Sequence, residues 1–114
     1  MLKKYVFILC LAALAGCAAN SAITGQWVQP IPGMEQQMQG FKLKKGGEAS
    51  SINMATLLYE KWEKQGNTLT LHGKSVGNGQ TLPFTESYTI QQLDGHTLKL
   101  LSNYGSVFTY TRPK

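Results

Sequence analysis

Most of the chain alternates between apolar and polar residues, the pattern of β-strands that bury one face and expose the other. Residues 68–72 alternate most regularly, with Leu69 and Leu71 between polar neighbours. The segments that we predict as strands are residues 25–29, 39–45, 48–54, 57–62, 68–72, 84–91, 96–101 and 106–111. This pattern predicts an all-β domain over residues 24–114, without a segment typical of a βαβ unit.

Short turn signals separate these segments and predict antiparallel hairpins between neighbouring strands. The glycine-containing pairs are Gly46-Gly47, Gly66-Asn67, Asp94-Gly95 and Tyr104-Gly105. Two connections are expected to be longer. Residues 30–39 hold two prolines and three glutamines and predict a long first loop. Residues 75–80, around Gly77-Asn78-Gly79, predict a second loop.

Residues 55–64 fit two kinds of element. As a strand they place Leu58, Glu60 and Trp62 on one face. As a helix they make about three turns, near the lower limit for an independent helix. We favour the strand, because hairpin signals flank the segment and residues typical of strands surround it. A β-bulge near Thr56 would reconcile its two apolar faces.

About eight strands joined by turns form an antiparallel up-and-down meander. Each strand has one apolar face to bury, and eight is the number at which a sheet closes around a filled or single-ligand interior. Closure also removes unpaired edges. We therefore predict that the meander closes into a barrel, with a flattened sandwich as the alternative.

The N-terminus carries a secretory signal. Lys3 and Lys4 precede an apolar run over residues 5–14, which is too short to span a membrane. Leu14-Ala15-Gly16-Cys17 resembles the lipobox of bacterial lipoproteins, in which the cysteine becomes the new N-terminus. The resemblance implies a diacylglycerol on Cys17 and, in most Gram-negative bacteria, an N-acyl chain. An ordinary cleavage site is the alternative.

Processing divides the chain into a lipoprotein signal peptide (residues 1–16), a lipidated tether (17–23) and the barrel domain (24–114). It removes Lys3, Lys4 and Cys10, so nine basic residues face six acidic ones, a net charge of +3. Acylation leaves no free thiol, which excludes a disulfide and a cysteine metal site. The expected partner is a membrane, reached through the lipid on Cys17. Nucleic acid is excluded, because no basic block is interleaved with aromatics.

The four residues after Cys17 bear on location. Ala18-Ala19-Asn20-Ser21 has no aspartate at its second position. Among lipoproteins that resemble enterobacterial ones, this favours the outer membrane over the inner membrane. We therefore expect a lipid-anchored protein of the cell envelope, on the periplasmic face of the outer membrane.

Several motifs in the predicted barrel are similar to those of a lipocalin-like (calycin-type) family of small bacterial lipoproteins. They are Gly25-Gln26-Trp27, Ser51-Ile52-Asn53-Met54, Tyr59-Glu60-Lys61-Trp62 and Gly77-Asn78-Gly79. The resemblance covers residues 24–113 and implies a lipocalin-like barrel. It implies neither an enzymatic activity nor a cofactor, because the family has no established activity.

A second resemblance is to the N-terminal barrel of a copper-responsive envelope-stress lipoprotein. That family also opens with a Gly-x-Trp motif and a proline-containing first loop, but its loop holds a Cys-x-x-Cys pair. Residues 30–39 contain no cysteine. The resemblance therefore extends to the scaffold and not to thiol metal chemistry.

Five residues are candidates for contact with a ligand. Trp27 is interpreted as a core plug at the closed end of the barrel, whereas Trp62 either lines a pocket or covers the outside. Glu86 shares an inward face with Tyr88, where a carboxylate must be paired, hydrated or protonated. It is either a polar ligand anchor or a residue near the wet mouth of the barrel. Tyr110 alternates in the same way on the last predicted strand.

The other polar and sulfur-containing residues receive structural interpretations. Met34 and Met38 lie in the first loop without a neighbouring histidine or cysteine, which favours packing over Cu(I) binding. His72 and His96 are expected at strand ends, in solvent, without a third metal ligand at useful spacing. No Gly-x-Ser-x-Gly elbow or other nucleophile motif occurs, so the sequence predicts neither an enzyme nor a metal site.

Two functions are consistent with these features. The first is a tethered barrel that binds a small hydrophobic or amphipathic molecule. The second is a filled barrel that acts in the envelope as a structural, interaction or stress-sensing protein through its loops. The volume left inside the barrel distinguishes them.

Overall fold

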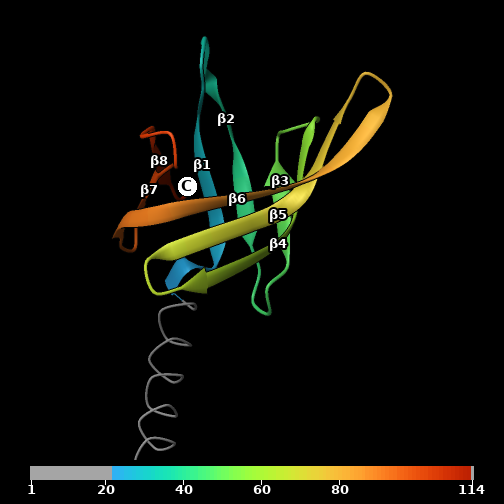
Figure 1. Ribbon diagram of the computed structural model, residues 1–114. Helices are drawn as coiled ribbons and strands as arrows, with labels where there is room; N and C mark the ends of the chain where they lie inside the picture. The colour runs from blue at the N-terminus through green and yellow to red at the C-terminus, as the bar shows by residue number, and fades with distance from the viewer. Residues whose placement is uncertain (1–21, 114) are drawn as a thin grey trace, which may run out of the picture.

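Eight antiparallel strands run up and down around one core in the computed structural model, which describes residues 22–113 (Figure 1). The strands are β1 (Gly25–Ile31), β2 (Met34–Leu43), β3 (Ala49–Ile52), β4 (Leu57–Gln65), β5 (Thr68–Gly77), β6 (Gln80–Leu93), β7 (Thr97–Leu101) and β8 (Val107–Thr111). Their order in the sheet is β3-β2-β1-β8-β7-β6-β5-β4. The predicted all-β meander of eight strands is confirmed.

Two seams close the sheet almost completely into a barrel. Between β1 and β8 the ladder consists of one pair, Val28 with Thr111. Between β3 and β4 an isolated bridge joins Glu48 to Lys61. Ser51 also spans this second seam, because its hydroxyl donates to the carbonyl of Leu57 at 2.5 Å and accepts from the amide of Tyr59 at 2.9 Å. A side chain therefore replaces part of the ladder where β3 and β4 separate.

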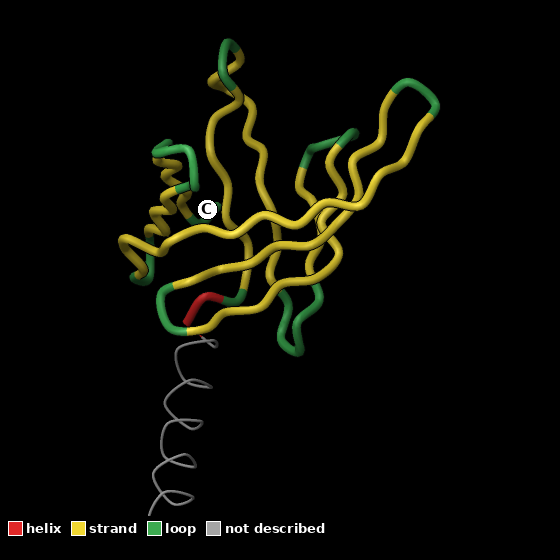
Figure 2. The backbone as a smooth tube through the Cα atoms, viewed as in Figure 1, coloured by secondary structure: helices red, strands yellow, loops and turns green. Residues whose placement is uncertain are grey.

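The up-and-down order places the turns alternately at two ends of the barrel. We name as the open end the turns β1–β2, β3–β4, β5–β6 and β7–β8. The other three turns, together with residues 22–24 and 112–113, form the closed end. The β1–β2 and β5–β6 hairpins project beyond the rest of the barrel at the open end (Figures 1 and 2).

Trp27 fills the closed end. It is completely buried, and its indole Nε1 donates to the carbonyl of Ile23 at 2.8 Å. The guanidinium of Arg112 lies 3.9 Å from the centroid of the indole ring. It donates to the carbonyls of Thr24 at 2.7 Å and Ala22 at 2.9 Å. Ala22 and Ile23, which the sequence analysis assigned to the tether, thus form a short helical turn that belongs to the fold (Figure 2).

The core is apolar, and two glycines let the backbone pack closely around it. Its fully buried side chains are Ile23, Trp27, Phe41, Leu43, Leu69, Leu71, Leu98 and Leu100. A side chain at Gly40 would collide with the Trp27 backbone, and one at Gly73 would collide with the Leu58 carbonyl. Both positions therefore require glycine, because backbone on the neighbouring strand occupies the space of a Cβ atom.

The prediction of two long loops, at residues 30–39 and 75–80, is wrong. The strands continue instead to two-residue turns, Pro32-Gly33 and Asn78-Gly79. Asn78 and Gly79 have φ values of 51° and 73°, as the tightest hairpin turn requires. In the first hairpin a register shift at Pro30/Ile31 accommodates the proline, which has no N–H to donate. The hairpin tips look like loops in the sequence because solvent surrounds both of their faces.

The strand prediction for residues 57–62 is confirmed, but the irregularity lies later than Thr56. The register of β4 against β5 shifts between Tyr59 and Lys61. The extra residue changes which side chains face inward, so Tyr59 and Trp62 are both buried, at 8% and 6% exposure. None of the helical residues within 22–113 forms a helix long and apolar enough to cross a bilayer.

Candidate functional site

The inner face of β6 carries a carboxylate. Glu86 is half-buried between Phe84 and Tyr88 on the face that the alternation predicts. The hydroxyl of Tyr88 donates to Oε2 of Glu86 at 2.8 Å. This is the one hydrogen bond of the Glu86 carboxylate within residues 22–113, so its other oxygen is left for water or a ligand.

Two more tyrosines lie close enough to Glu86 for its negative charge to act on them. Tyr59 and Tyr110 are buried at 8% and 7% exposure. Their hydroxyls make no hydrogen bond with the described part of the protein. Because no fully buried side-chain oxygen in that part lacks a partner, both hydroxyls keep some contact with solvent. Tyr59, Glu86, Tyr88 and Tyr110 are here called the tyrosine–carboxylate cluster.

The environment keeps these tyrosines protonated. Burial, and then the charge of Glu86, raise the pKa of Tyr110 to about 12. Burial, followed by the proximity of Tyr110 and Glu86, raises the pKa of Tyr59 further. Burial and the hydrogen bond to Glu86 likewise raise the pKa of Tyr88. At neutral pH the three hydroxyls of the cluster are thus protonated and uncharged.

Aromatic rings surround the carboxylate on several strands. Phe41 lies with its centroid 5.5 Å from that of Tyr59 and 4.9 Å from that of Tyr110. The ring of Tyr59 also meets that of Phe84 edge to face at 5.7 Å. The corresponding distance between Tyr88 and Phe108 is 6.2 Å. These separations are those of favourable aromatic pairs, so the rings hold the hydroxyls in place.

A small pocket borders this cluster. Strand β6 pairs with β7 only from Thr89 onward, opposite Leu101, so residues 85–88 have no strand beside them on that side. The gap next to the β7–β8 turn, at the open end, has a volume of about 80 Å³. We call it the side pocket; it is lined by Thr85, Glu86, Ser87, Tyr88, Ser102, Asn103 and Tyr104. Drug-sized ligands occupy pockets of roughly 300–1,000 Å³, so this one accommodates a head group.

Comparison with known proteins identifies the barrel. A family model described as lipocalin-like matches residues 19–113. The chain belongs to this lipocalin-like family. Its structure is similar to the crystal structure of a lipocalin-like protein from Bacteroides thetaiotaomicron VPI-5482, with a TM-score of 0.74 and 49% sequence identity. The match covers 81% of this chain and 97% of that one. A search of curated proteins found no match.

The lipocalin-like fold separates the predicted site residues. Glu86, Tyr88 and Tyr110 lie together in the tyrosine–carboxylate cluster. Trp27 lies in the closed end, with none of its surface exposed. Trp62 is a core residue whose Nε1 donates to the carbonyl of Lys44 at 2.8 Å. Cys17 lies outside the described residues.

Tyr59 belongs to the cluster, and the sequence analysis did not select it. Strict alternation along β4 puts it on the face opposite Trp62. The register shift between Tyr59 and Lys61 turns both side chains inward. The sequence held a signal for a bulge, because both faces of the segment carry apolar residues, but that signal did not locate it.

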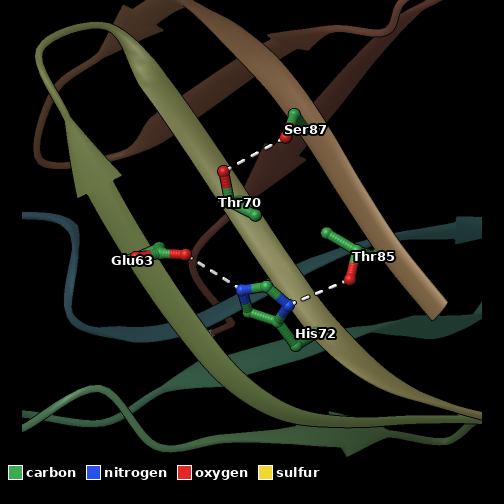
Figure 3. Close-up of polar contacts among 5 residues, drawn as sticks. All are labelled: Glu63, Thr70, His72, Thr85 and Ser87. Carbon is green, nitrogen blue, oxygen red and sulfur yellow. Dashed lines mark hydrogen bonds and ion pairs between the residues drawn. The ribbon is translucent and has the colours of Figure 1, made fainter. Parts of the chain in front are cut away.

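The outer face of β4, β5 and β6 of this lipocalin-like barrel carries a row of polar contacts (Figure 3). His72 lies within β5 and not at its end, which corrects the prediction. Its Nε2 is 3.0 Å from Oε1 of Glu63, and its Nδ1 is 3.0 Å from the hydroxyl of Thr85. The hydroxyls of Thr70 and Ser87 are 3.1 Å apart.

A hydroxyl, an imidazole and a carboxylate follow one another in this row, as they do in the catalytic triads of hydrolases. Unlike those triads, the row lies on an exposed surface. The side chains of His72 and Glu63 are 38% and 56% exposed. Exposed cross-strand pairs of this kind contribute a few tenths of a kcal/mol each and set strand register. Within residues 22–113, no three histidine, cysteine, aspartate or glutamate side chains are grouped so as to hold a metal ion. The row is therefore a structural feature of the sheet surface.

Proposed function

We propose that this lipocalin-like protein is a lipid-anchored binding protein of the bacterial cell envelope, and that a small amphipathic molecule binds beside the tyrosine–carboxylate cluster. One observation supports the proposal above the others. Glu86 lies half-buried on the inner face, where an apolar residue would pack better and cost less to desolvate. Within residues 22–113 one oxygen of this carboxylate and two nearby tyrosine hydroxyls have no hydrogen-bond partner, an arrangement that serves recognition better than packing.

The size of the side pocket indicates how such a molecule is held. Its 80 Å³ accommodates a polar head group, and the remainder of the molecule lies on the surface. The strands that lead to the open end expose large apolar side chains for that contact. They are Met34, Met38, Leu58 and Leu82, each between 37% and 59% exposed. Flexible methionines and leucines of this kind suit an apolar tail.

The anchor in this proposal is the lipid on Cys17. The five steps from Cys17 to Ala22 span at most about 18 Å when fully extended. Since Ala22 lies at the closed end, a bilayer holding the lipid faces that end, and the open end points away from it. Lys44 and Lys45, exposed in the β2–β3 turn of the closed end, suit anionic head groups. The proposed location is the periplasmic face of the outer membrane.

Binding, rather than catalysis, is the proposed activity of the cluster. A general acid or base works best when its pKa is near the working pH. The raised pKa values of Tyr59, Tyr88 and Tyr110 make their hydroxyls weaker acids than usual. They suit the donation and acceptance of hydrogen bonds to a bound molecule.

Native mass spectrometry of the mature lipidated protein, purified from its own host, tests the proposal. The expected result is a co-purifying small molecule on the wild type and on Glu60→Gln, and its loss from Glu86→Gln. Glu60 is the matched control, because it is an outward carboxylate, 50% exposed, 3.6 Å from Nζ of Lys74. A barrel that is consistently empty in the wild type would contradict the proposal.

A filled barrel that contacts envelope proteins is the second candidate. It is favoured by the tightly filled core and by the apolar side chains exposed towards the hairpin tips. In that case the mass of the purified barrel corresponds to protein and anchor lipid alone. Photo-crosslinkers placed at Gln36, in the β1–β2 hairpin, should then give one reproducible protein adduct, and crosslinkers placed at Asn67, at the closed end, should not.

A further inference from the structure

We infer that the tyrosine–carboxylate cluster selects an organic cation: an ammonium group, carried by an apolar tail, is held in the side pocket against Glu86 and the tyrosines that line it, Tyr88 and Tyr104. The inference rests on the proposed binding function and adds the chemical class of the ligand.

The closed end shows how this barrel holds a cation of its own. The guanidinium of Arg112 lies 3.9 Å from the centroid of Trp27, and two backbone carbonyls accept its N–H groups. The site therefore combines an aromatic face with oxygen acceptors. These are the two elements that proteins use to bind ammonium and guanidinium groups.

The tyrosine–carboxylate cluster offers the same two elements, aromatic rings and oxygen acceptors. Its tyrosine rings belong to three strands, β4, β6 and β8, and its Glu86 carboxylate lines the side pocket together with Tyr88. Within residues 22–113 the ion pairs join His72 to Glu63 and Lys74 to Glu60, both on the outer surface. Glu86 has no such partner there. A positive charge beside Glu86 is therefore supplied by the bound molecule.

The geometry also favours a cation over the other head groups. An anion in the side pocket would face the negative charge of Glu86 at close range, in a half-buried setting where screening is weaker than in bulk water. A neutral sugar or alcohol would form hydrogen bonds but would gain nothing from the charge. A primary or methylated ammonium gains from the carboxylate and from the tyrosines that line the pocket.

The pocket matches this group in size and access. Its 80 Å³ is enough for an ammonium with small substituents and too small for a bulky ring system. Ser102 and Asn103 add polar groups on the side of the β7–β8 turn. Tyr104, which is 94% exposed on the same turn, is free to close over a bound group. The tail then leaves the pocket across the surface of the barrel.

Three probes with the same eight-carbon tail test the inference: octyltrimethylammonium, octyl glucoside and octyl sulfate. The soluble barrel (residues 18–114) is used, below the micelle concentration of each probe. The similar crystal structure is matched over 97% of its chain by 81% of this one, so a chain of about the barrel's extent forms this fold, and circular dichroism checks that residues 18–114 are folded. Isothermal titration calorimetry should show that the cation binds about tenfold or more tightly than either other probe.

The net charge of the protein strengthens this test. The mature chain carries +3, so attraction by overall charge favours octyl sulfate and opposes the expected order. A preference for the cation must therefore arise in the pocket. Glu86→Gln should lose about tenfold in affinity for octyltrimethylammonium, and Glu60→Gln should keep the wild-type value. Circular dichroism checks that both variants are folded. If Glu86→Gln does not fold, the order of affinity of the wild type for the three probes tests the inference by itself.

Each other outcome overturns the inference in a distinct way. Equal binding of all three probes, or tighter binding of octyl sulfate, would leave the binding function standing and remove its selectivity for cations. A normal affinity of Glu86→Gln for the cation would place the site elsewhere. If no probe binds and the protein from its own host is empty, the proposed function fails as well.

Discussion

At the closed end of the barrel the indole N–H of Trp27 and the guanidinium of Arg112 have partners in the chain, whereas several polar groups of the tyrosine–carboxylate cluster have none within residues 22–113. The indole N–H donates to Ile23, and the guanidinium over it donates to two carbonyls. On the inner face of β6 the only partner of Glu86 within residues 22–113 is one tyrosine hydroxyl. The same eight strands thus support one group of polar side chains that are paired with the chain and another that is only partly paired within residues 22–113.

This difference separates stability from binding. Fully buried apolar side chains around Trp27 remove large areas from water and contribute most to the free energy of unfolding. The cluster around Glu86 buries polar groups that must be kept hydrated or paired, and it contributes less. Substitutions at the two places should therefore differ in kind as well as in size.

The largest expected effect is at the closed end. Trp27→Ala should lower the free energy of unfolding by about 3–5 kcal/mol, because it leaves a cavity and deprives Arg112 of its aromatic contact. Urea denaturation followed by circular dichroism measures the loss. Leu82→Ala, at a side chain that is 59% exposed on the β5–β6 hairpin, is the control and should change the value by no more than about 0.5 kcal/mol. Equal losses in the two variants would remove the distinction between the ends.

A smaller effect is expected where β5 crosses from the packed barrel into its projecting hairpin. Gly73→Ala should cost about 1–3 kcal/mol, because the new methyl group collides with the Leu58 carbonyl and the Phe84 ring. Gly77→Ala, four residues further along β5, meets no atom within 4 Å and should be neutral or slightly stabilising. Thermal unfolding of both variants measures where tight packing ends. A neutral Gly73→Ala would show that the close approach of β4 and β5 is easily relaxed.

The smallest effect at neutral pH comes from the tyrosines, and it grows only in alkali. In the unfolded chain a tyrosine loses its proton near its ordinary pKa of 10.0, whereas burial and Glu86 hold the pKa of Tyr110 at about 12. The unfolded state therefore binds fewer protons above pH 10, and stability falls as the pH rises from 10 through 12. Below pH 10 this contribution is fully present.

Urea midpoints measured between pH 7 and pH 11.5 test this dependence. The wild type should be flat up to about pH 10 and then lose stability, and Tyr110→Phe should lose it less steeply because one buried hydroxyl is gone. A wild-type curve that stays flat to pH 11.5 would contradict the raised pKa values and the low polarity of the cluster that they imply.

Much of this could be predicted from local patterns in the sequence. Alternation along residues 84–91 was enough to place Glu86 and Tyr88 on one inward face, because a strand repeats every two residues. Glycine pairs located most of the turns. The strand predicted at residues 57–62 followed from its neighbours rather than from its own pattern.

What could not be predicted depends on contacts between distant residues. Arg112 contacts Ala22, which lies 90 positions away in the sequence, and no local pattern predicts that contact. The register shift after Tyr59 moves one tyrosine from the outer to the inner face, and only pairing with β5 fixes where the shift falls. The hairpins at residues 30–39 and 75–80 were missed because their tips bury little. A strand that buries neither face needs no alternation of apolar and polar residues, so the sequence there does not look like a strand.

The Arg112 contact has one further consequence, for how the chain can be rearranged. It ties the last described residues to Ala22 and Thr24, so the beginning and the end of the fold lie next to each other. Two ends so close can be joined by a short linker, and new ends can be cut at the exposed Asn78-Gly79 turn of the β5–β6 hairpin. Such a circularly permuted barrel would keep every strand pair. Its N-terminus would lie at the open end instead of the closed end, so a lipid attached there would turn the open end towards the membrane.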